Sequence, residues 1–220
     1  MDQRPFEHRG FMLDVCRHYM PVENIKKLIY AAAISGMNRM HWHLCDDQGF
    51  RIEIRKYPRL TEKGAFRGTS FFGGVDPEEN NDGFYTQEEV REIVSFAKDK
   101  GIEIIPEIEL PGHASAMLYS YPEYSCTGRV GIQRSLGIFK DLICAGKERS
   151  IRFLEDILDE VTELFPFPTV HIGGDECPKT RWKQCPKCQA KIQQLGLHDD
   201  GRFKAEDYLQ SYVMNRMERF

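Results

Sequence analysis

Asp175 and Glu176 are adjacent carboxylic acids that follow a β-branched segment, residues 169–173, and the glycine pair Gly173-Gly174. Two acids confined in one site repel each other when both are ionised, which tends to keep one protonated near neutral pH. A protonated carboxyl group is what a general acid needs. The alternative is a plain acidic turn. The double glycine, which permits unusual backbone conformations, and the strand-end position favour a catalytic pair.

A second group of reactive side chains lies at residues 41–47, where His41 and His43 flank Trp42, and Asp46 and Asp47 follow. Alternate residues of a strand point to the same face, so the two histidines could act together. They could hold a divalent metal with Asp46, as in metal-dependent amidohydrolases, or form hydrogen bonds around a sugar site. The metal interpretation requires further histidines from later strands.

His113 follows Pro111-Gly112 and lies four residues after the carboxylate Glu109. A histidine at this place could relay or tune protons, and the alternative is a loop histidine without a role. His113 and His171 are also the candidates for the additional ligands that a metal site would need.

The chain contains seven cysteines, an odd number that does not describe a disulfide scaffold. Cys16 lies in an apolar stretch and is interpreted as core. Cys126 and Cys144 bracket a loop and could pair in an oxidising compartment.

Cys185 and Cys188 have the spacing of half a zinc site or of a redox pair. No second pair follows at a suitable spacing, and Cys177 is the nearest additional ligand. A structural zinc or a local disulfide remains open, and a reduced, exposed motif at a helix start is the favoured interpretation.

Strand and helix patterns alternate along the chain. The expected strands are residues 10–15, 38–44, 102–108 and 169–173. The expected helices are residues 22–35, 86–100, 150–164, 180–195 and 204–220. Thr86 and Glu89 form a capping box, Ser150 is expected to cap its helix, and Pro106 is expected to end regular pairing. Residues 50–54 alternate like a hairpin arm, and residues 73–83 are typical of a loop.

Acids or histidines follow all four expected strands, beginning with Asp14 after the first. A doubly wound sheet concentrates its ligand groups near one switch point, whereas a (β/α)8 TIM barrel uses the ends of all its strands. That barrel typically needs about 250 residues. The sequence therefore predicts an α/β chain in which residues 1–220 are one domain, the N-terminal part of a TIM-barrel catalytic domain with about the first four to five β/α units.

Composition narrows the function classes. A hydrophobic content of 41 % and a charged content of 29 % indicate a packed globular core. The formal net charge is −4 and the chain has no block of basic residues, which argues against nucleic acid as a partner. No apolar run is long enough to span a membrane, and residues 1–5 carry no secretory signal. The localisation stays open between cytoplasmic and secreted. Unpaired sheet edges of an incomplete barrel would favour self-association.

Four segments together resemble the β-N-acetylhexosaminidases of glycoside hydrolase family 20. They are residues 9–18 (RGFMLDVCRH), 38–49 (NRMHWHLCDDQG), 106–114 (PEIELPGHA) and 171–176 (HIGGDE), and the resemblance extends from about residue 9 to residue 181. It implies a (β/α)8 barrel that removes terminal non-reducing β-linked GlcNAc or GalNAc with retention, through an oxazolinium intermediate formed by the substrate's own acetamido group.

The resemblance also implies residue roles. Glu176 would act as general acid and base, and Asp175 would orient the acetamido group. Arg9, Asp46 and His113 would bind the substrate. The supporting residues would be Asp47, His43 and Glu109, although many members carry aspartate at the position of Glu109.

No metal or cofactor is implied at this site, and carbohydrate is the implied partner. The family's later strands supply tryptophans and a tyrosine to the sugar pocket, and neither Trp182 nor Tyr208 is assigned those roles. The choice between GlcNAc and GalNAc stays open, as do the linkage and the natural substrate. Two competing hypotheses remain: a metal-dependent hydrolase that uses His41, His43 and Asp46, and a chain that alone binds sugar weakly or not at all.

Overall fold

The computed structural model describes residues 6–68 and 81–220. Its strands are β1 Gly10–Asp14, β2 Arg39–His43, β3 Cys45–Asp46, β4 Gly49–Phe50 and β5 Glu103–Glu107. Its helices are α1 Val22–Ile34, α2 Arg59–Glu62, α3 Gln87–Asp99, α4 Ser115–Ser120, α5 Glu148–Leu164, α6 Thr180–Gln184, α7 Pro186–Gln194 and α8 Ala205–Glu218, with the 3-10 turn η1 Pro122–Tyr124. None of these helices is long and apolar enough to cross a membrane.

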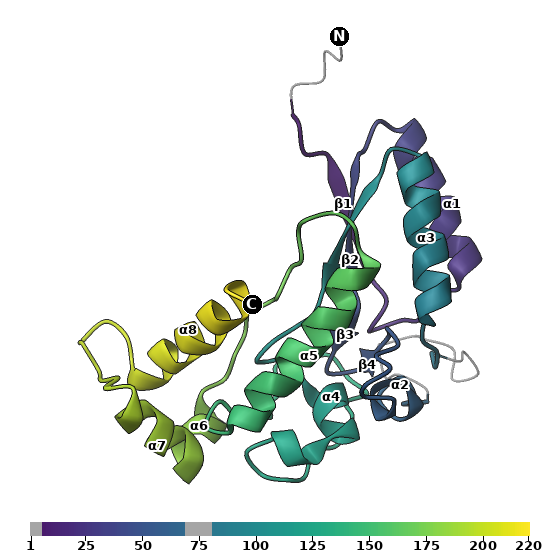
Figure 1. The fold of residues 1–220 in the computed structure, drawn as a ribbon. Coiled ribbons are helices and arrows are strands. Elements are labelled where there is room, and N and C mark those ends of the chain that lie inside the picture. The colour runs from purple at the N-terminus through teal and green to yellow at the C-terminus, as the bar shows by residue number, and fades with distance from the viewer. Residues whose placement is uncertain (1–5, 69–80) are drawn as a thin grey trace.

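A parallel sheet in the order β1-β2-β5 forms the centre of the fold, and α1 and α3 lie side by side on one of its flanks (Figure 1). The register places Asp14 beside His43 and His43 beside Glu107, so three strands end at the same level. This common edge is where parallel α/β folds carry their functional groups.

The two faces of β2 have different partners. Met40 and Trp42 are fully buried on the helix side, where the Trp42 ring lies 5.0 Å from the ring of Tyr85. His41 and His43 point to the opposite face, as the alternation of a strand requires. The hydrophobic side of β2 thus anchors the strand, and the other side carries polar groups to the sheet edge.

The fourth expected strand, residues 169–173, is reduced to one bridge between His171 and Glu107. The backbone N–H of His171 donates to Pro106 at 2.9 Å, and the N–H of Ile108 donates to His171 at 3.0 Å. No strand within residues 6–68 and 81–220 pairs with the other side of this segment, so the prediction of a full strand was wrong for this chain.

The expectation that Pro106 ends regular pairing was also wrong, because Pro106 lies opposite Trp42 inside β5. The N–H of Ile108 points to the His171 segment. Because the backbone of a strand alternates, the nitrogen of Pro106 faces the same sparsely paired side as that of Ile108. Proline has no N–H to donate, and on this side no ladder hydrogen bond is lost.

A buried arginine organises the chain that follows β2. Arg51 is fully buried, and its guanidinium group donates to five backbone carbonyl groups at 2.8–3.1 Å. The acceptors are those of Val15, Cys16, Ala65, Asn81 and Gly83. The expected arm 50–54 contributes only Phe50 to the β3–β4 hairpin, while Ile52 bridges to Tyr85. Of the expected loop 73–83, residues 73–80 lie outside the described residues.

Helix ends follow local signals in one place and tertiary contacts in another. The capping box of Thr86 and Glu89 is confirmed at the start of α3. Ser150 does not cap α5, which begins two residues earlier at Glu148; instead Ser150 is buried and its hydroxyl donates to the carbonyl of Tyr124 at 3.3 Å. The expected helix 180–195 is interrupted at Cys185, which lies between α6 and α7.

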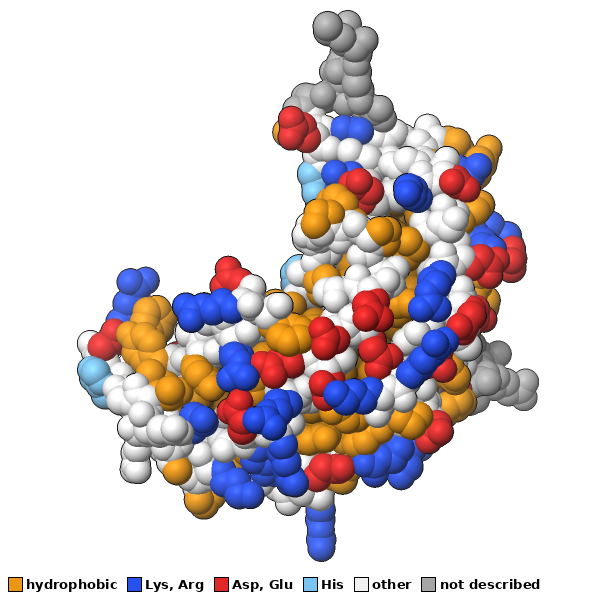
Figure 2. Space-filling view, viewed as in Figure 1, with side chains coloured by type: hydrophobic (Ala, Val, Ile, Leu, Met, Phe, Trp, Pro, Cys, Tyr) orange, Lys and Arg blue, Asp and Glu red, His pale blue; other side chains and the backbone are white. Residues whose placement is uncertain are grey.

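An arm formed by α6, α7 and α8 extends from the body that carries the sheet (Figure 1). Between this arm and the body, Figure 2 shows a hollow with exposed hydrophobic side chains. Val170, Ile172, Met214 and Met217 are among the residues that line a cavity there. Lysine, arginine, aspartate and glutamate side chains are interspersed over the face drawn in Figure 2.

Candidate active site

A pocket of 510 Å³ lies at the carboxyl ends of the parallel strands. Its lining residues are Met12, Arg17, His41, His43, Asp46, Glu107, Glu109, His113, His171, Gly173, Asp175 and Glu176. All the site residues expected from the sequence are in this set except Arg9 and Asp47. Its size is within the range of pockets that enclose one small ligand.

Three histidines surround the buried carboxylate of Glu107. His41 Nε2 lies 2.7 Å and His43 Nδ1 2.5 Å from one of its oxygens, and His171 Nδ1 lies 2.7 Å from the other. Burial opposes ionisation, but the hydrogen bonds from His41 and His43 outweigh it and hold the pKa of Glu107 well below its ordinary value. The sequence analysis assigned Glu107 no role, although its position at a strand end beside Glu109 was a usable signal.

Glu109 is held in the opposite state. Burial, followed by the neighbouring Glu107 and the charge of Asp175, raises the pKa of Glu109 to about 9. A Cβ atom at Gly173 would lie 1.9 Å from Glu109 Oε2, so any other residue at this position would force the Glu109 carboxyl group to move. Gly173 also adopts φ +61°, a conformation that glycine accepts at little cost. Glu109, which lies close to Asp175 in space, is therefore a carboxyl group of this pocket that keeps its proton near neutral pH.

A buried network connects Asp46 and Asp47 to His113. Nδ1 of His113 lies 3.2 Å from Asp46 and 3.1 Å from Asp47, and these two contacts raise the pKa of His113 to about 11. Asp47 also accepts from the backbone N–H of Ser115 at 2.9 Å. Asp47 thus supports His113 from beneath the pocket.

Asp46 connects the two histidine groups. Its carboxylate lies 2.7 Å from His43 Nε2 and 2.7 Å from a guanidinium nitrogen of Arg17. Burial would raise the pKa of Asp46, but hydrogen bonds from His113 and His43 and the charge of Arg17 lower it to about 2. Burial likewise opposes protonation of His43, yet the bonds to Asp46 and Glu107 raise its pKa to about 10.

Asp175 and Glu176 lie at the mouth of the pocket. His113 Nε2 is 3.4 Å from Glu176 and 4.0 Å from Asp175, and the two acidic side chains are 50 % and 66 % exposed. Glu176 has φ +40°, a strained conformation for a residue with a side chain. Backbone strain of this kind is characteristic of functional sites. Both carboxyl groups are accessible to a ligand, and one histidine joins them to the buried network.

The structure does not bring Arg9 to this pocket, so the expected contact between Arg9 and the substrate is corrected. Arg9 precedes β1, and its guanidinium group donates to the carbonyl of Gly36 at 2.7 Å, at the amino end of the sheet. The five residues of β1 separate that end from the pocket by about 16 Å. Arg17, which the sequence analysis did not single out, lines the pocket instead.

The side chains of His41 and His43 share a face, and the ligand atoms of His41, Glu107 and His171 lie within 4.8 Å of one another, a spacing that a metal ion could bridge. Each of them has a carboxylate partner: His41 bonds to Glu107, and His43 bonds to Glu107 and Asp46. These hydrogen bonds explain the two histidines as parts of a charged network.

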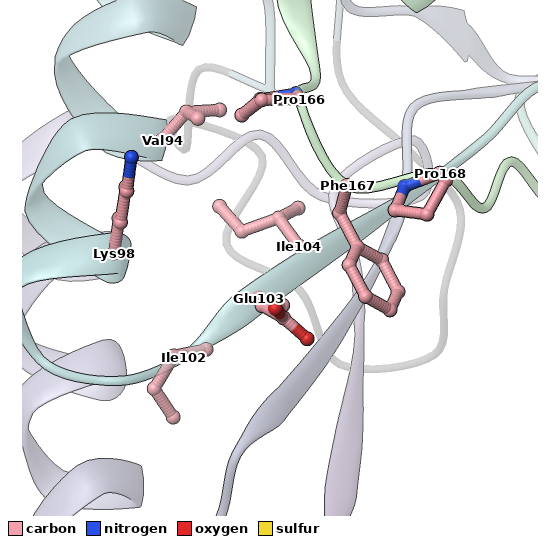
Figure 3. A pocket seen from close by; sticks show the side chains of 8 residues that line it. All are labelled: Val94, Lys98, Ile102, Glu103, Ile104, Pro166, Phe167 and Pro168. Atoms are coloured by element: carbon pink, nitrogen blue, oxygen red, sulfur yellow. The ribbon is translucent and has the colours of Figure 1, made fainter.

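A second hollow lies at the opposite end of β5 (Figure 3). It is lined mainly by apolar side chains, among them Val94, Ile104 and Phe167. Its acid, Glu103, is 2.8 Å from Arg39 in an ion pair. This hollow lacks the convergent polar groups of the strand-end pocket.

The family model described as "Glycosyl hydrolase family 20, catalytic domain" matches residues 6–220. A β-hexosaminidase of Porphyromonas gingivalis is 49 % identical over 223 residues, which cover 99 % of this chain and 27 % of that protein. The chain therefore spans about a quarter of the length of this curated relative.

Solved structures give the same result. The crystal structure of a β-N-acetylhexosaminidase from Bacteroides fragilis matches with a TM-score of 0.81 and 39 % identity, over 97 % of this chain and 40 % of that chain. An exo-β-N-acetylglucosaminidase from Vibrio harveyi, in complex with N-acetylglucosamine, matches with a TM-score of 0.82 and 38 % identity, over 98 % of this chain and 34 % of that chain.

Proposed function

The chain belongs to glycosyl hydrolase family 20, and from that premise we propose that its protein removes terminal non-reducing β-linked N-acetylhexosamine with retention of configuration. The three-stranded sheet and the bridged fourth segment are accordingly part of a (β/α)8 barrel. The names of the relatives and the N-acetylglucosamine bound to the Vibrio harveyi enzyme support this substrate class.

The observation that carries the proposal is the accessible pair Asp175 and Glu176 at the carboxyl ends of the strands, joined by His113 to a buried charged network. Two neighbouring acids suit a substrate whose own amide is the nucleophile, because each can contact a different group. Glu176 would contact the glycosidic oxygen, and Asp175 would contact the acetamido group.

In this mechanism the acetamido oxygen attacks the anomeric carbon while Glu176 donates its proton to the departing glycosidic oxygen. The products of this step are the free aglycone and an oxazolinium ion, whose growing positive charge is stabilised by the carboxylate of Asp175. Glu176, now ionised, removes a proton from water as the water attacks the same carbon. The amide is regenerated, and the sugar leaves with its original configuration.

His113 acts as a positioning residue in this scheme. Its Nδ1 side is fixed by Asp46 and Asp47, and its Nε2 side faces Glu176 at 3.4 Å. The buried pair of aspartates thereby sets the orientation of the imidazole against the proposed general acid. His43 and Glu109 support the floor of the same pocket.

The direct test is hydrolysis of an aryl β-N-acetylglucosaminide by the protein that carries this sequence, with the anomer of the released sugar observed by NMR. We expect first release of the β-anomer, inhibition by N-acetylglucosamine-thiazoline, and activity that survives brief exposure to a chelator. First release of the α-anomer would exclude the mechanism. Loss of activity within the time of chelation, with the folded structure unchanged by circular dichroism, would favour the metal-dependent hydrolase.

A further inference from the structure

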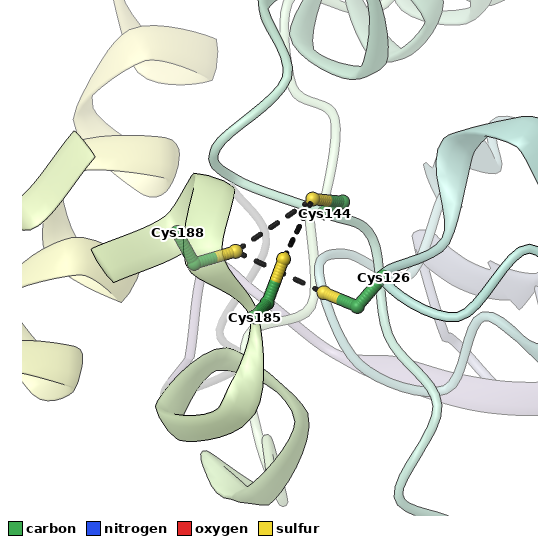
Figure 4. A group of neighbouring side chains, drawn as sticks. All are labelled: Cys126, Cys144, Cys185 and Cys188. Carbon is green, nitrogen blue, oxygen red and sulfur yellow. Dashed lines mark hydrogen bonds between the residues drawn. The ribbon is translucent and has the colours of Figure 1, made fainter. Parts of the chain in front are cut away.

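Four cysteines from two distant parts of the chain meet beside the start of α7 (Figure 4). The sulfur of Cys144 lies 3.6 Å from that of Cys188 and 3.8 Å from that of Cys185, and the sulfurs of Cys126 and Cys188 are 3.8 Å apart. The favoured expectation of an exposed Cys185 and Cys188 motif was wrong, because both residues are buried. Cys126 and Cys144, for which pairing was left open, share one cluster with them.

The spacing of the sulfurs separates the two chemistries open to such a cluster. A disulfide requires sulfurs about 2.05 Å apart. Four thiolates around a tetrahedral zinc ion at about 2.3 Å lie about 3.8 Å from one another. Three of the six separations are 3.6–3.8 Å and all six are within 4.8 Å, which agrees with the second geometry and excludes the first for those three pairs. We propose that Cys126, Cys144, Cys185 and Cys188 bind a structural Zn²⁺ ion.

The donor set suits this ion. Four thiolates with one Cys-x2-Cys pair are a common structural zinc site, and soft sulfur donors select zinc over magnesium or calcium. All four ligand positions are filled by the protein, and three of the cysteines are buried, so no position is left for substrate or catalytic water. The ion would therefore hold the fold together and take no part in hydrolysis.

Local structure prepares the cluster. Cys185 is the N-cap of α7 and Cys188 is in its first turn, so both thiolates lie at the positive end of a nine-residue helix. A Cβ atom at Gly146 would lie 2.2 Å from the backbone carbon of Lys187, so glycine is required where the two segments approach.

Two contacts outside the cluster join the same segments. The indole N–H of Trp182 donates to the carbonyl of Ile143 at 2.9 Å, next to Cys144. Ser125, next to Cys126, pairs with Ile143 in an antiparallel bridge. The segments that carry the cysteines are thus joined by contacts that do not involve sulfur.

A metal at this place would tie the loop that follows the His113 segment to the arm that follows Glu176. Cys177 is adjacent to Glu176 and is not part of the cluster. Zinc would thereby fix the far ends of both segments that carry the proposed catalytic groups. The inference rests on sulfur geometry, and it holds or fails independently of the glycosidase proposal.

The first experiment measures metal content by inductively coupled plasma mass spectrometry on the chain purified under reducing conditions without chelator. We expect one zinc per chain in the wild type, background zinc in Cys188→Ser, and one zinc per chain in Cys177→Ser. The Cys177 variant is the matched control, because it removes a partly buried thiol close in sequence that lies outside the cluster.

A second measurement uses the wild type alone, so it does not depend on whether a variant folds. Titration of the wild type with a mercurial reagent is expected to release one zinc for four thiols, and replacement by Co²⁺ is expected to give the intense visible absorption of a tetrahedral thiolate site. Wild type without stoichiometric zinc that also fails to take up Co²⁺ would overturn the proposal. An intact mass showing disulfides within the cluster of the native protein would overturn it too.

Discussion

Glu176 and Asp175 are adjacent in the chain, yet only Glu176 comes within 3.4 Å of His113 Nε2. In a protein that carries this sequence within a complete barrel, we expect Glu176→Gln to lower kcat by about 10²–10⁴-fold, because an amide cannot donate and then accept the proton. The rate of the first step should fall less for substrates with good leaving groups. A series of aryl glycosides that differ in their leaving groups measures this difference.

Asp175→Asn should also reduce kcat severely, since the growing charge on the acetamido group loses its carboxylate partner. Glu163→Gln, on the exposed face of α5, is the matched control and should be unchanged. Wild-type kinetics in Glu176→Gln or Asp175→Asn would end the assignment.

His113 makes the unfolding free energy depend on pH. Hydrogen bonds to Asp46 and then Asp47 raise its pKa to about 11, whereas an unfolded histidine titrates near 6.5. The folded state keeps this proton at pH values where the unfolded state has lost it. The stabilisation is therefore complete below about pH 6.5 and is lost as the pH rises toward 11.

Urea unfolding of wild type between about pH 7.5 and 10 should lose about 1.4 kcal/mol per pH unit more than unfolding of His113→Gln. His198→Gln, an exposed histidine near the start of the loop before α8, should match the wild-type slope. Parallel pH profiles for wild type and His113→Gln would contradict the charged network.

At the scale of elements, the turn that presents the acid pair depends on Gly173. Gly173→Ala should cost about 1–2 kcal/mol for the left-handed backbone and should also displace the Glu109 carboxyl group. Gly196→Ala is the matched control, because Gly196 has φ +66° with no atom near its missing Cβ. Thermal unfolding and activity of both variants separate the cost of the left-handed backbone from the cost of displacing Glu109. Equal losses in the two would show that the approach of Glu109 is unimportant.

The segment between β2 and α3 depends on Arg51 in the same way. Arg51→Met should destabilise by about 3–5 kcal/mol, because five buried carbonyl groups lose their donor. Arg55→Met, which removes an exposed ion pair with Glu88, should cost no more than about 1 kcal/mol. Denaturant unfolding of both variants measures the difference, and similar losses would refute the structural role of Arg51.

Elements with local signals could be predicted from the sequence, and elements that depend on distant partners could not. The Thr86–Glu89 box fixed the start of α3 because both groups lie within four residues. Ser150 misled because its hydroxyl bonds to Tyr124, 26 residues away. The strand at 169–173 failed for a similar reason, since a strand requires a neighbour on which to form its ladder.

Candidate site residues followed the same division. The strand-end rule located Asp46, His113, Asp175 and Glu176. Arg9 was carried over from the family resemblance alone, and its position before β1 had no support from that rule.

At the scale of the whole molecule, two edges of the parallel sheet lack a full partner strand among the described residues. The outer edge of β1 has no partner strand within residues 6–68 and 81–220, and the His171 segment has only one bridge. Exposed strand edges and an apolar hollow at Val170 and Met214 favour association. Light scattering on the purified 220-residue chain should show species larger than a monomer, and a strictly monomeric chain at high concentration would contradict this.

The same two edges should limit catalysis by the 220-residue chain. Its pocket is walled by three strands and one bridged segment, so a bound sugar keeps much of its surface in water. We expect little or no turnover of aryl glycosides by this chain, and turnover by a protein in which this sequence is part of a complete (β/α)8 barrel. Strong turnover by the isolated chain would refute this expectation.

Arg51 also has a consequence for the order of assembly. Its acceptors extend from Val15, just after β1, to Gly83, beyond the hairpin and α2. With any of these pieces absent, the guanidinium group would be withdrawn from water without full compensation. A partly assembled form of this region is therefore higher in free energy than either the solvated or the complete form. Amide hydrogens on both sides of Arg51 should thus exchange with solvent together, as one cooperative unit.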